Sequence, residues 1–241
     1  HKNIFKGGEW LSLSVMGNFQ VSVKNETRAI EFGANAGLSF PTFLLLPSSV
    51  FRNIVPRTDI NLTYNYQQRP EYSRNMIGGK FGWSWGSKNN KWYFQATPLQ
   101  INIVNLPYYS PQFMESLTNP FVREAYKNHF DLGLGYNMQY SSTPSINPKV
   151  SYLKASLQVD ISGNLISAFN KFMPKDSTGA YTIWDSPYSQ YIRAEGSASY
   201  TWMFGKDNKQ ALAVRGLIGA GLAYGNSSKM PFERLFWGGG P

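Results

Sequence analysis

The sequence predicts an all-β protein, a transmembrane antiparallel β-barrel with long extracellular loops and short periplasmic turns. Three observations predict this fold class. Apolar residues occupy every second position in run after run, and most runs are nine residues or longer. The alternate positions are mostly Gly, Ser, Thr, Asn and Gln. Strands with one apolar face and one uncharged polar face suit a wall between lipid and a wet lumen.

About nine strands are expected from these runs. The first run sets Leu11, Leu13 and Val15 against Ser12 and Ser14, which is the period of two that a strand requires. Soluble strands average five or six residues, whereas about ten tilted residues are needed to cross a hydrocarbon slab. In order along the chain, the expected strands are 11–21, 30–40, 59–67, 77–85, 92–103, 130–140, 153–161, 192–204 and 212–224.

Proline marks places where the ladder or a helix is interrupted. Pro98 lies inside the fifth run and predicts a bulge, because proline cannot donate to the ladder. The pairs Ser110-Pro111 and Asn119-Pro120 each have the form of an N-cap followed by proline at the first helical position. Short surface helices are therefore expected in that connection.

The strands of a soluble β-sandwich or a lipocalin-like barrel would also alternate apolar and polar residues. In such a protein the face opposite the apolar one meets bulk water and carries many Lys and Glu residues, which these runs lack. Large aromatic residues also lie near strand ends, where the aromatic girdle of a membrane barrel would place them. They include Tyr64, Tyr66, Trp83, Trp85, Tyr200 and Trp202.

Composition narrows the possible functions. There is no run of eighteen apolar residues, so a helical membrane span is excluded. The chain has no cysteine and two histidines, which leaves little for thiol, metal or triad chemistry. The net charge of +9 is a weak indication of phosphate partners. We expect no enzyme activity, no cofactor, no metal and no nucleic-acid partner.

Charged residues at polar strand positions are expected to form a network in the lumen rather than to act as acids and bases. They are Lys80, Asp131, Arg193, Glu195 and Arg215. The glycine-rich run Gly216 to Gly225 alternates as a strand and lacks the Lys-Ser/Thr of a phosphate loop. Its glycines predict room for something packed against the inner wall.

Connection lengths predict an orientation, because outer-membrane barrels keep short turns on the periplasmic side. Asn105–Asn128 and Gly163–Gln190 are long, whereas Ser141–Lys149 and Gly205–Gln210 are short. Pro41–Arg57 is the exception, a long link on the short side that is expected along the inner membrane interface. In the expected outer loops, lipopolysaccharide phosphates are predicted to contact Arg69, Arg74, Lys171 and Lys175.

Four segments resemble the BamA/TamA superfamily of outer-membrane insertases and translocases, the bacterial surface antigen barrels. Residues 231–241, PFERLFWGGGP, are similar to the segment that leads into the Arg-Gly-aromatic tip of the family's lid loop. Residues 3–8, NIFKGG, resemble the turn before an early barrel strand, and 65–72 and 186–191 resemble the Bacteroidetes TamA-like (TamL) branch. The lid-loop residues carried by the resemblance are Phe232, Glu233, Arg234, Phe236, Gly238 and Gly239.

The resemblance implies that residues 1–241 are one partial barrel domain, strands three to eleven of sixteen. POTRA domains and the remaining strands are expected outside this chain, which is interpreted as an internal segment cut within the lid loop. The implied function is to insert or translocate outer-membrane proteins, or to transport lipid, through a lateral seam. Implied partners are lipopolysaccharide, membrane lipid, unfolded clients, a periplasm-spanning TamB-like protein and accessory lipoproteins, in a Gram-negative outer membrane. The alternative is a passive porin or transporter.

Overall fold

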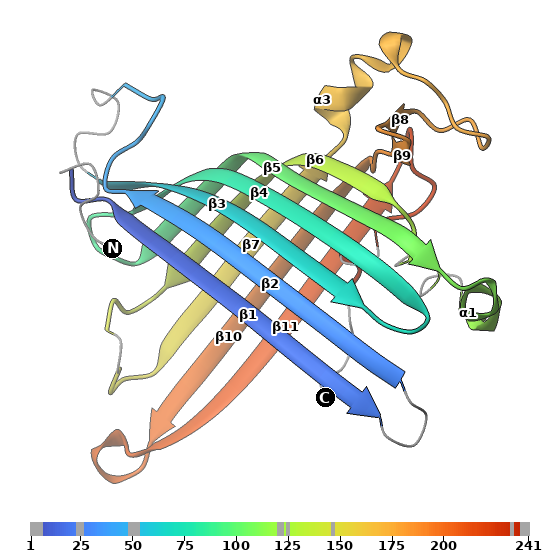
Figure 1. The fold of residues 1–241 in the computed structure, drawn as a ribbon. Helices are drawn as coiled ribbons and strands as arrows, with labels where there is room; N and C mark the ends of the chain where they lie inside the picture. Colours follow the sequence, from blue (N-terminus) through green and yellow to red (C-terminus); the bar gives the residue numbers. More distant parts are fainter. Residues whose placement is uncertain are drawn as a thin grey trace.

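The structure, a computed structural model, describes residues 7–22, 27–47, 54–119, 123, 126–145, 148–231 and 234–236. Its main feature is one curved sheet of nine antiparallel strands that follow one another as a meander (Figure 1). The strands of this sheet are β1 (Trp10–Ser22), β2 (Thr27–Phe40), β3 (Val55–Gln68), β4 (Tyr72–Gly86), β5 (Trp92–Tyr109), β6 (His129–Ser141), β7 (Tyr152–Ser162), β10 (Tyr191–Phe204) and β11 (Gln210–Ala223).

The predicted count of nine strands and their antiparallel order are confirmed. The sheet is not closed into a barrel, because β1 pairs only with β2, and β11 only with β10, within the described residues. Several strands are longer than the apolar runs. β5 continues to Tyr109, opposite Tyr72 of β4, because the backbone ladder does not require an apolar side chain at every second position.

The bulge predicted at Pro98 is confirmed. The register between β5 and β6 shifts between Thr97 and Gln100, and the register between β4 and β5 shifts between Phe81 and Trp83. Proline has no backbone N–H to donate. Because both ladders are interrupted at this point, no carbonyl of a neighbouring strand is left without a donor.

The two ends of the sheet differ in their connections. The loop end carries residues 69–71, 110–128 and 163–190, and the turn end carries 41–54, 87–91, 142–151 and 205–209. The predicted alternation of long and short connections thus holds from β5 onward. The link from β3 to β4 is short although it lies at the loop end.

Helix α1 (Pro111–Ser116) occupies the connection after β5 at the loop end. The predicted cap is confirmed, since the Ser110 hydroxyl accepts from the Phe113 amide at 3.2 Å. An aromatic cluster holds the helix against the sheet, with ring centroids of Tyr72 and Phe113 5.5 Å apart and of Tyr72 and Tyr126 4.9 Å apart. Pro120, of the second predicted cap, lies outside the described residues.

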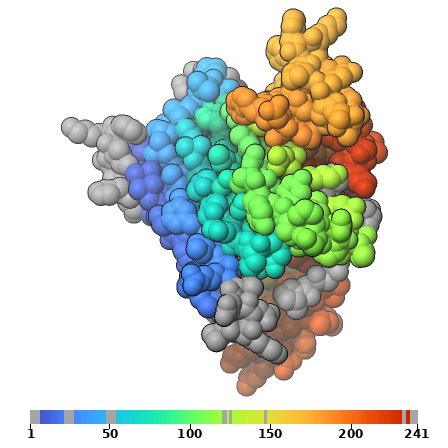
Figure 2. Space-filling model, turned by 45° about the vertical axis from the view of Figure 1, so that its right-hand side comes forward, coloured from blue at the N-terminus to red at the C-terminus, as the bar shows by residue number. Residues whose placement is uncertain are grey.

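The connection from β7 to β10 folds into a compact loop. It contains α3 (Asn164–Ser167), the 3-10 turn η2 (Asn170–Phe172) and the small pair β8 (Thr182–Ile183) and β9 (Ser186–Pro187). Ile166 and Tyr188 of the loop form a buried hydrophobic cluster with Phe130 of β6. Figure 2 shows this loop, in yellow to orange, standing out from the end of the sheet. A further 3-10 turn, η3 (Lys206–Asn208), joins β10 to β11.

One face of the sheet, the apolar face, exposes large hydrophobic side chains. Leu13 of β1 is 71% exposed and Ile218 of β11 is 78% exposed. The buried hydrophobic residues among those described all lie at the loop end, so burial does not cover the middle of the sheet. They are Tyr72, Val104, Leu106, Phe130, Ile166, Tyr188, Tyr191 and Met230.

Aromatic side chains form a belt on the apolar face near the turn end. Ring centroids are 5.5 Å apart for Trp85 and Phe94, 6.0 Å for Phe94 and Trp92, and 4.6 Å for Trp92 and Tyr140. The Pro41–Arg57 link contacts this belt, because the ring centroids of Phe43 and Trp85 are 6.0 Å apart, and the Trp83 indole donates to the Leu44 carbonyl at 2.9 Å. That part of the link therefore lies along the apolar face.

Candidate functional site

The opposite face, the polar face, carries the predicted lumen charges. The register aligns Lys80 of β4 with Gln100 of β5, and Gln100 with Gly133 of β6. Farther along, Arg193 of β10 is aligned with Asp160 of β7. A side-chain contact between β7 and β10 supports this assignment. The Ser156 and Ser197 hydroxyls are 2.8 Å apart, so both side chains lie on the polar face. By this alignment Lys80, Asp131, Arg193, Glu195 and Arg215 share one face.

Arg193 is the centre of an ion cluster on this face. Its guanidinium contacts Glu195 Oε2 at 2.5 Å and Asp160 Oδ2 at 3.6 Å. The side chains of Arg193 and Asp160 are only 13% and 10% exposed, so both charges are largely removed from water. A cation between two carboxylates compensates both, and each carboxylate left alone would be strongly destabilising.

The chain after β11 folds back onto this cluster. The Arg193 Nε donates to the Arg234 carbonyl at 3.1 Å, and its guanidinium lies 4.3 Å from the centre of the Phe236 ring. Arg234 also lines a small cavity together with Asp131 and Asp160. One arginine thus binds two carboxylates, a backbone carbonyl and an aromatic face. We call residues 224–231 and 234–236 the folded-back segment.

Two glycines of β11 provide the surface on which the folded-back segment lies. A Cβ at Gly219 would collide with the Phe236 ring, and a Cβ at Gly221 would collide with the Met230 sulfur. At Gly216, whose Cβ would meet nothing within 4 Å, no such contact exists. The predicted room for a packed group is therefore present at Gly219 and Gly221 but not at Gly216.

Asn226 attaches the start of this segment to the loop between β7 and β10. Its Oδ1 accepts from the Tyr181 amide at 2.7 Å, and its Nδ2 donates to the carbonyls of Tyr181 and Tyr188 at 2.9 Å. Its own amide donates to Gln190 Oε1 at 3.0 Å. Gly225, with a φ of 60°, makes the turn, since a Cβ there would collide with the Gln190 side chain. Two chain segments far apart in sequence are thereby joined.

Among the other predicted residues, Asp131 lines the small cavity beside Asp160 and Arg234. Lys80 of β4 interacts electrostatically with Arg234 and Asp160, whereas Arg215 lies on β11 toward the turn end. Of the six lid-loop residues, Arg234 and Phe236 are in the folded-back segment, whereas Phe232, Glu233, Gly238 and Gly239 lie outside the described residues.

The residues predicted to contact lipopolysaccharide are all at the loop end, but in different elements. Arg69 follows β3 in the short connection, and Lys171 and Lys175 are exposed in the loop before β10. The Lys175 ammonium lies 4.6 Å from the centre of the Tyr181 ring. Arg74 is not in a loop as expected. It lies in β4 opposite Gln67, because the strand pairing begins close to the tight connection at 69–71.

A tight turn stabilises the loop next to Lys175. The Asp176 carboxylate accepts from the Thr178 hydroxyl at 2.7 Å and from the Ala180 amide at 3.0 Å. The hydrogen bond from the Thr178 hydroxyl, followed by those from backbone amides, holds the pKa of Asp176 below its ordinary value. In the same loop, burial raises the pKa of the Tyr188 phenol, whose hydroxyl donates to Asn170 Oδ1.

The described residues offer little for metal chemistry. They contain no group of three or more His, Cys, Asp or Glu side chains placed to hold a metal ion. The helices of the described part of the chain are too short or too polar to cross a membrane. The His129 ring is buried, with Nδ1 3.1 Å from the Lys127 carbonyl.

No protein-family model matches the chain, and a search of the curated proteins finds no relative. The resemblance to the BamA/TamA superfamily thus stays a prediction from the quoted segments.

Proposed function

We propose that this sheet is part of a transmembrane β-barrel in the outer membrane of a Gram-negative bacterium. Its strands of 11 to 18 residues reach or exceed the nine to eleven that a tilted strand needs to cross the hydrocarbon. The exposed apolar face would lie against lipid, with the aromatic belt at the interface, and the polar face would line the lumen.

The two edge strands of the sheet are the reason to propose that further strands complete the barrel. β1 and β11 have 13 and 14 residues, and each pairs on one side only within the described sheet. Backbone groups left unpaired in hydrocarbon would cost several kcal/mol each, so a membrane sheet must close. A sixteen-stranded barrel with a seam between its first and last strands is the closure that we propose.

Within that barrel we propose the activity of an insertase or translocase of the BamA/TamA type, in its Bacteroidetes TamA-like branch. The observation that carries this proposal is the folded-back segment, which lies on the polar face beside Arg193 instead of continuing along the sheet. A weakly paired seam would open sideways and offer its strand edge to an unfolded outer-membrane client. No covalent step is involved.

The proposed partners follow from this activity. Unfolded outer-membrane proteins or lipid would be the substrates, and lipopolysaccharide would contact the loop end. A periplasm-spanning TamB-like protein and accessory lipoproteins would act with the barrel. A passive porin is the alternative, but the folded-back segment occupies the face that an open pore would keep free.

Single-channel recording of the full-length protein in planar bilayers tests this proposal. We expect a small, unstable conductance that increases when Gly219→Val displaces the folded-back segment. Gly216→Val is the control on the apolar face of the same strand, where a Cβ meets nothing within 4 Å. A large, steady conductance of the unmodified protein would favour the porin. A folding assay then tests the activity itself, since liposomes that contain the protein should fold an unfolded outer-membrane protein faster than empty ones.

A further inference from the structure

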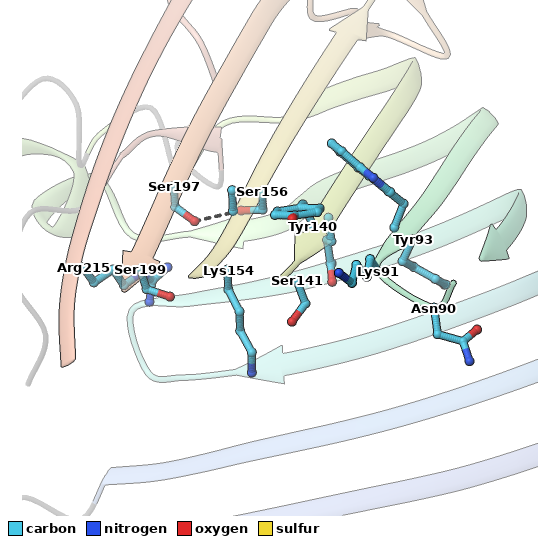
Figure 3. A pocket seen from close by; sticks show the side chains of 13 residues that line it. Asn90, Lys91, Tyr93, Tyr140, Ser141, Lys154, Ser156, Ser197, Ser199 and Arg215 are labelled. Atoms are coloured by element: carbon cyan, nitrogen blue, oxygen red, sulfur yellow. Dashed lines mark hydrogen bonds between the residues drawn. The ribbon is translucent and has the colours of Figure 1, made fainter. Parts of the chain in front are cut away.

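A second polar site lies at the turn end, away from the ion cluster. It is a cavity of about 430 Å³ lined by residues of β5, β6, β7, β10 and β11. Figure 3 shows the labelled side chains around it, with the hydrogen bond between Ser156 and Ser197. The residues that line the cavity include three cations and no carboxylate.

Cations and serines alternate across neighbouring strands in one row. The register aligns Arg215 with Ser199, Ser199 with Lys154, and Lys154 with Ser141. The row continues to Lys91, whose carbonyl accepts from the Ser141 amide at 2.7 Å. All five residues line the cavity.

In this structure the Lys154 ammonium lies 5.3 Å from the centre of the Tyr152 ring, but the spacing of the strands would let Lys154 and Arg215 turn toward one anion. Neighbouring strands lie about 4.8 Å apart, so Arg215 and Lys154, two strands apart, have backbones about 10 Å from each other. Long Lys and Arg side chains can span half of that distance each. The serine between them supplies a hydroxyl at the same point.

Within the part of the chain that the structure describes, no ion pair joins a carboxylate to Lys91, Lys154 or Arg215. Glu195 and Asp160 are engaged with Arg193. Glu195 is four residues along β10 from Ser199, which corresponds to about 13 Å. In the turn between β10 and β11, Asp207 pairs with Lys209 at 3.4 Å. The positive charge of the cavity is therefore available to a ligand.

We propose that this cavity is a binding site for a phosphate ester. A guanidinium offers paired donors to phosphate oxygens, and the ammonium groups and hydroxyls supply donors to the remaining ones. A planar carboxylate has two oxygens and would leave part of this donor set unused. The volume falls in the range of small-molecule sites, so the cavity holds a phosphate together with the group esterified to it. The site is separate from the folded-back segment and does not depend on insertase activity.

Calorimetric titration of the full-length protein in detergent tests the site with three probes. These are glycerol 3-phosphate, inorganic phosphate and a short-chain phosphatidylglycerol below its micelle concentration. We expect the ester probes to bind, and the double variant Lys154→Gln/Arg215→Gln to weaken their binding by about tenfold or more, as the loss of charge-assisted hydrogen bonds implies. The charge-preserving variant Lys154→Arg/Arg215→Lys should retain most of the binding.

The matched control is Lys206→Gln/Lys209→Gln, which removes the same charge from the turn at the same end of the sheet. Its affinity should stay within about twofold of the unmodified protein, since exposed charges act weakly through water. Equal losses in both double variants would overturn the proposal, as would binding of inorganic phosphate alone. Tighter binding of an aspartate-rich peptide than of either ester would also overturn it. If the bilayer recordings contradicted the proposed insertase activity, the result of these titrations would still decide whether the cavity binds phosphate esters.

Discussion

Replacing Phe236 by alanine should release the folded-back segment from the polar face. The ring lies over Gly219 and faces the Arg193 guanidinium at 4.3 Å, and it is 36% exposed. Full burial of a phenylalanine contributes about 1.5–3 kcal/mol. Because the ring is about two thirds buried, its replacement by alanine should lose roughly two thirds of that free energy. A cation–π contact at a partly exposed site adds about 0.5–1 kcal/mol. The expected cost is about 2 kcal/mol, which is a roughly 30-fold increase in the released population.

Trypsin provides the assay, because we expect cleavage after Arg234 to require release of the segment, whose Arg234 carbonyl accepts from Arg193. When opening and closing are fast relative to cleavage, the cleavage rate follows the released population. We expect cleavage at Arg234 to be about 30-fold faster in Phe236→Ala, with the same direction of change in Gly219→Ala.

Two controls separate release from general loosening of the protein. Phe172→Ala removes a ring that is 86% exposed, and Gly216→Ala adds a Cβ that meets nothing within 4 Å. Neither should change cleavage at Arg234. An unchanged rate in Phe236→Ala would refute the role given to the ring.

Three further predictions concern the rest of the site. Arg193→Gln should lower the free energy of unfolding by about 3 kcal/mol or more in urea titrations, because the buried Asp160 and the partly exposed Glu195 lose their cation; Lys206→Gln, on an exposed side chain in the turn after β10, should change it by less than about 0.5 kcal/mol. Asn226→Ala should speed hydrogen exchange of the Tyr181 amide, whose bond to Asn226 is worth about 1 kcal/mol, whereas Ser228→Ala should not. The Asp176 turn should be fully stable above the ordinary pKa of 3.8 and should loosen as pH falls below it, because the folded pKa is depressed; Asp176→Asn should abolish this pH dependence of Ala180 amide exchange.

The strands could be predicted because their information is local. A period of two in side-chain polarity determines which face each residue takes, and the missing N–H of Pro98 determines the bulge. The Ser110 cap is local in the same sense. The ends of strands were less predictable. Val55 and Pro56 extend β3 through backbone pairing with Gly86 and Trp85, which the side-chain pattern does not encode.

The candidate site was predictable only in part, because its contacts join distant segments. Arg193 could be placed on the polar face from its parity, but its partner Asp160 depends on the pairing of β7 with β10 across a long loop. The glycines of β11 indicated a packed group without indicating which one. Asn226, which joins two loops through four hydrogen bonds, carries no local pattern apart from its place after Gly225.

The central claim, that this sheet crosses a membrane with its apolar face in lipid, can be tested directly by spin labelling. Single nitroxides placed from Ile192 to Phe204 of β10, in the full-length protein in liposomes, report their access to lipid-soluble oxygen and to a water-soluble nickel reagent. We expect alternation with a period of two, in which labels at Ile192, Tyr200 and Trp202 are more accessible to oxygen and labels at Glu195 and Ser197 are more accessible to nickel. High access to nickel at every position would contradict it.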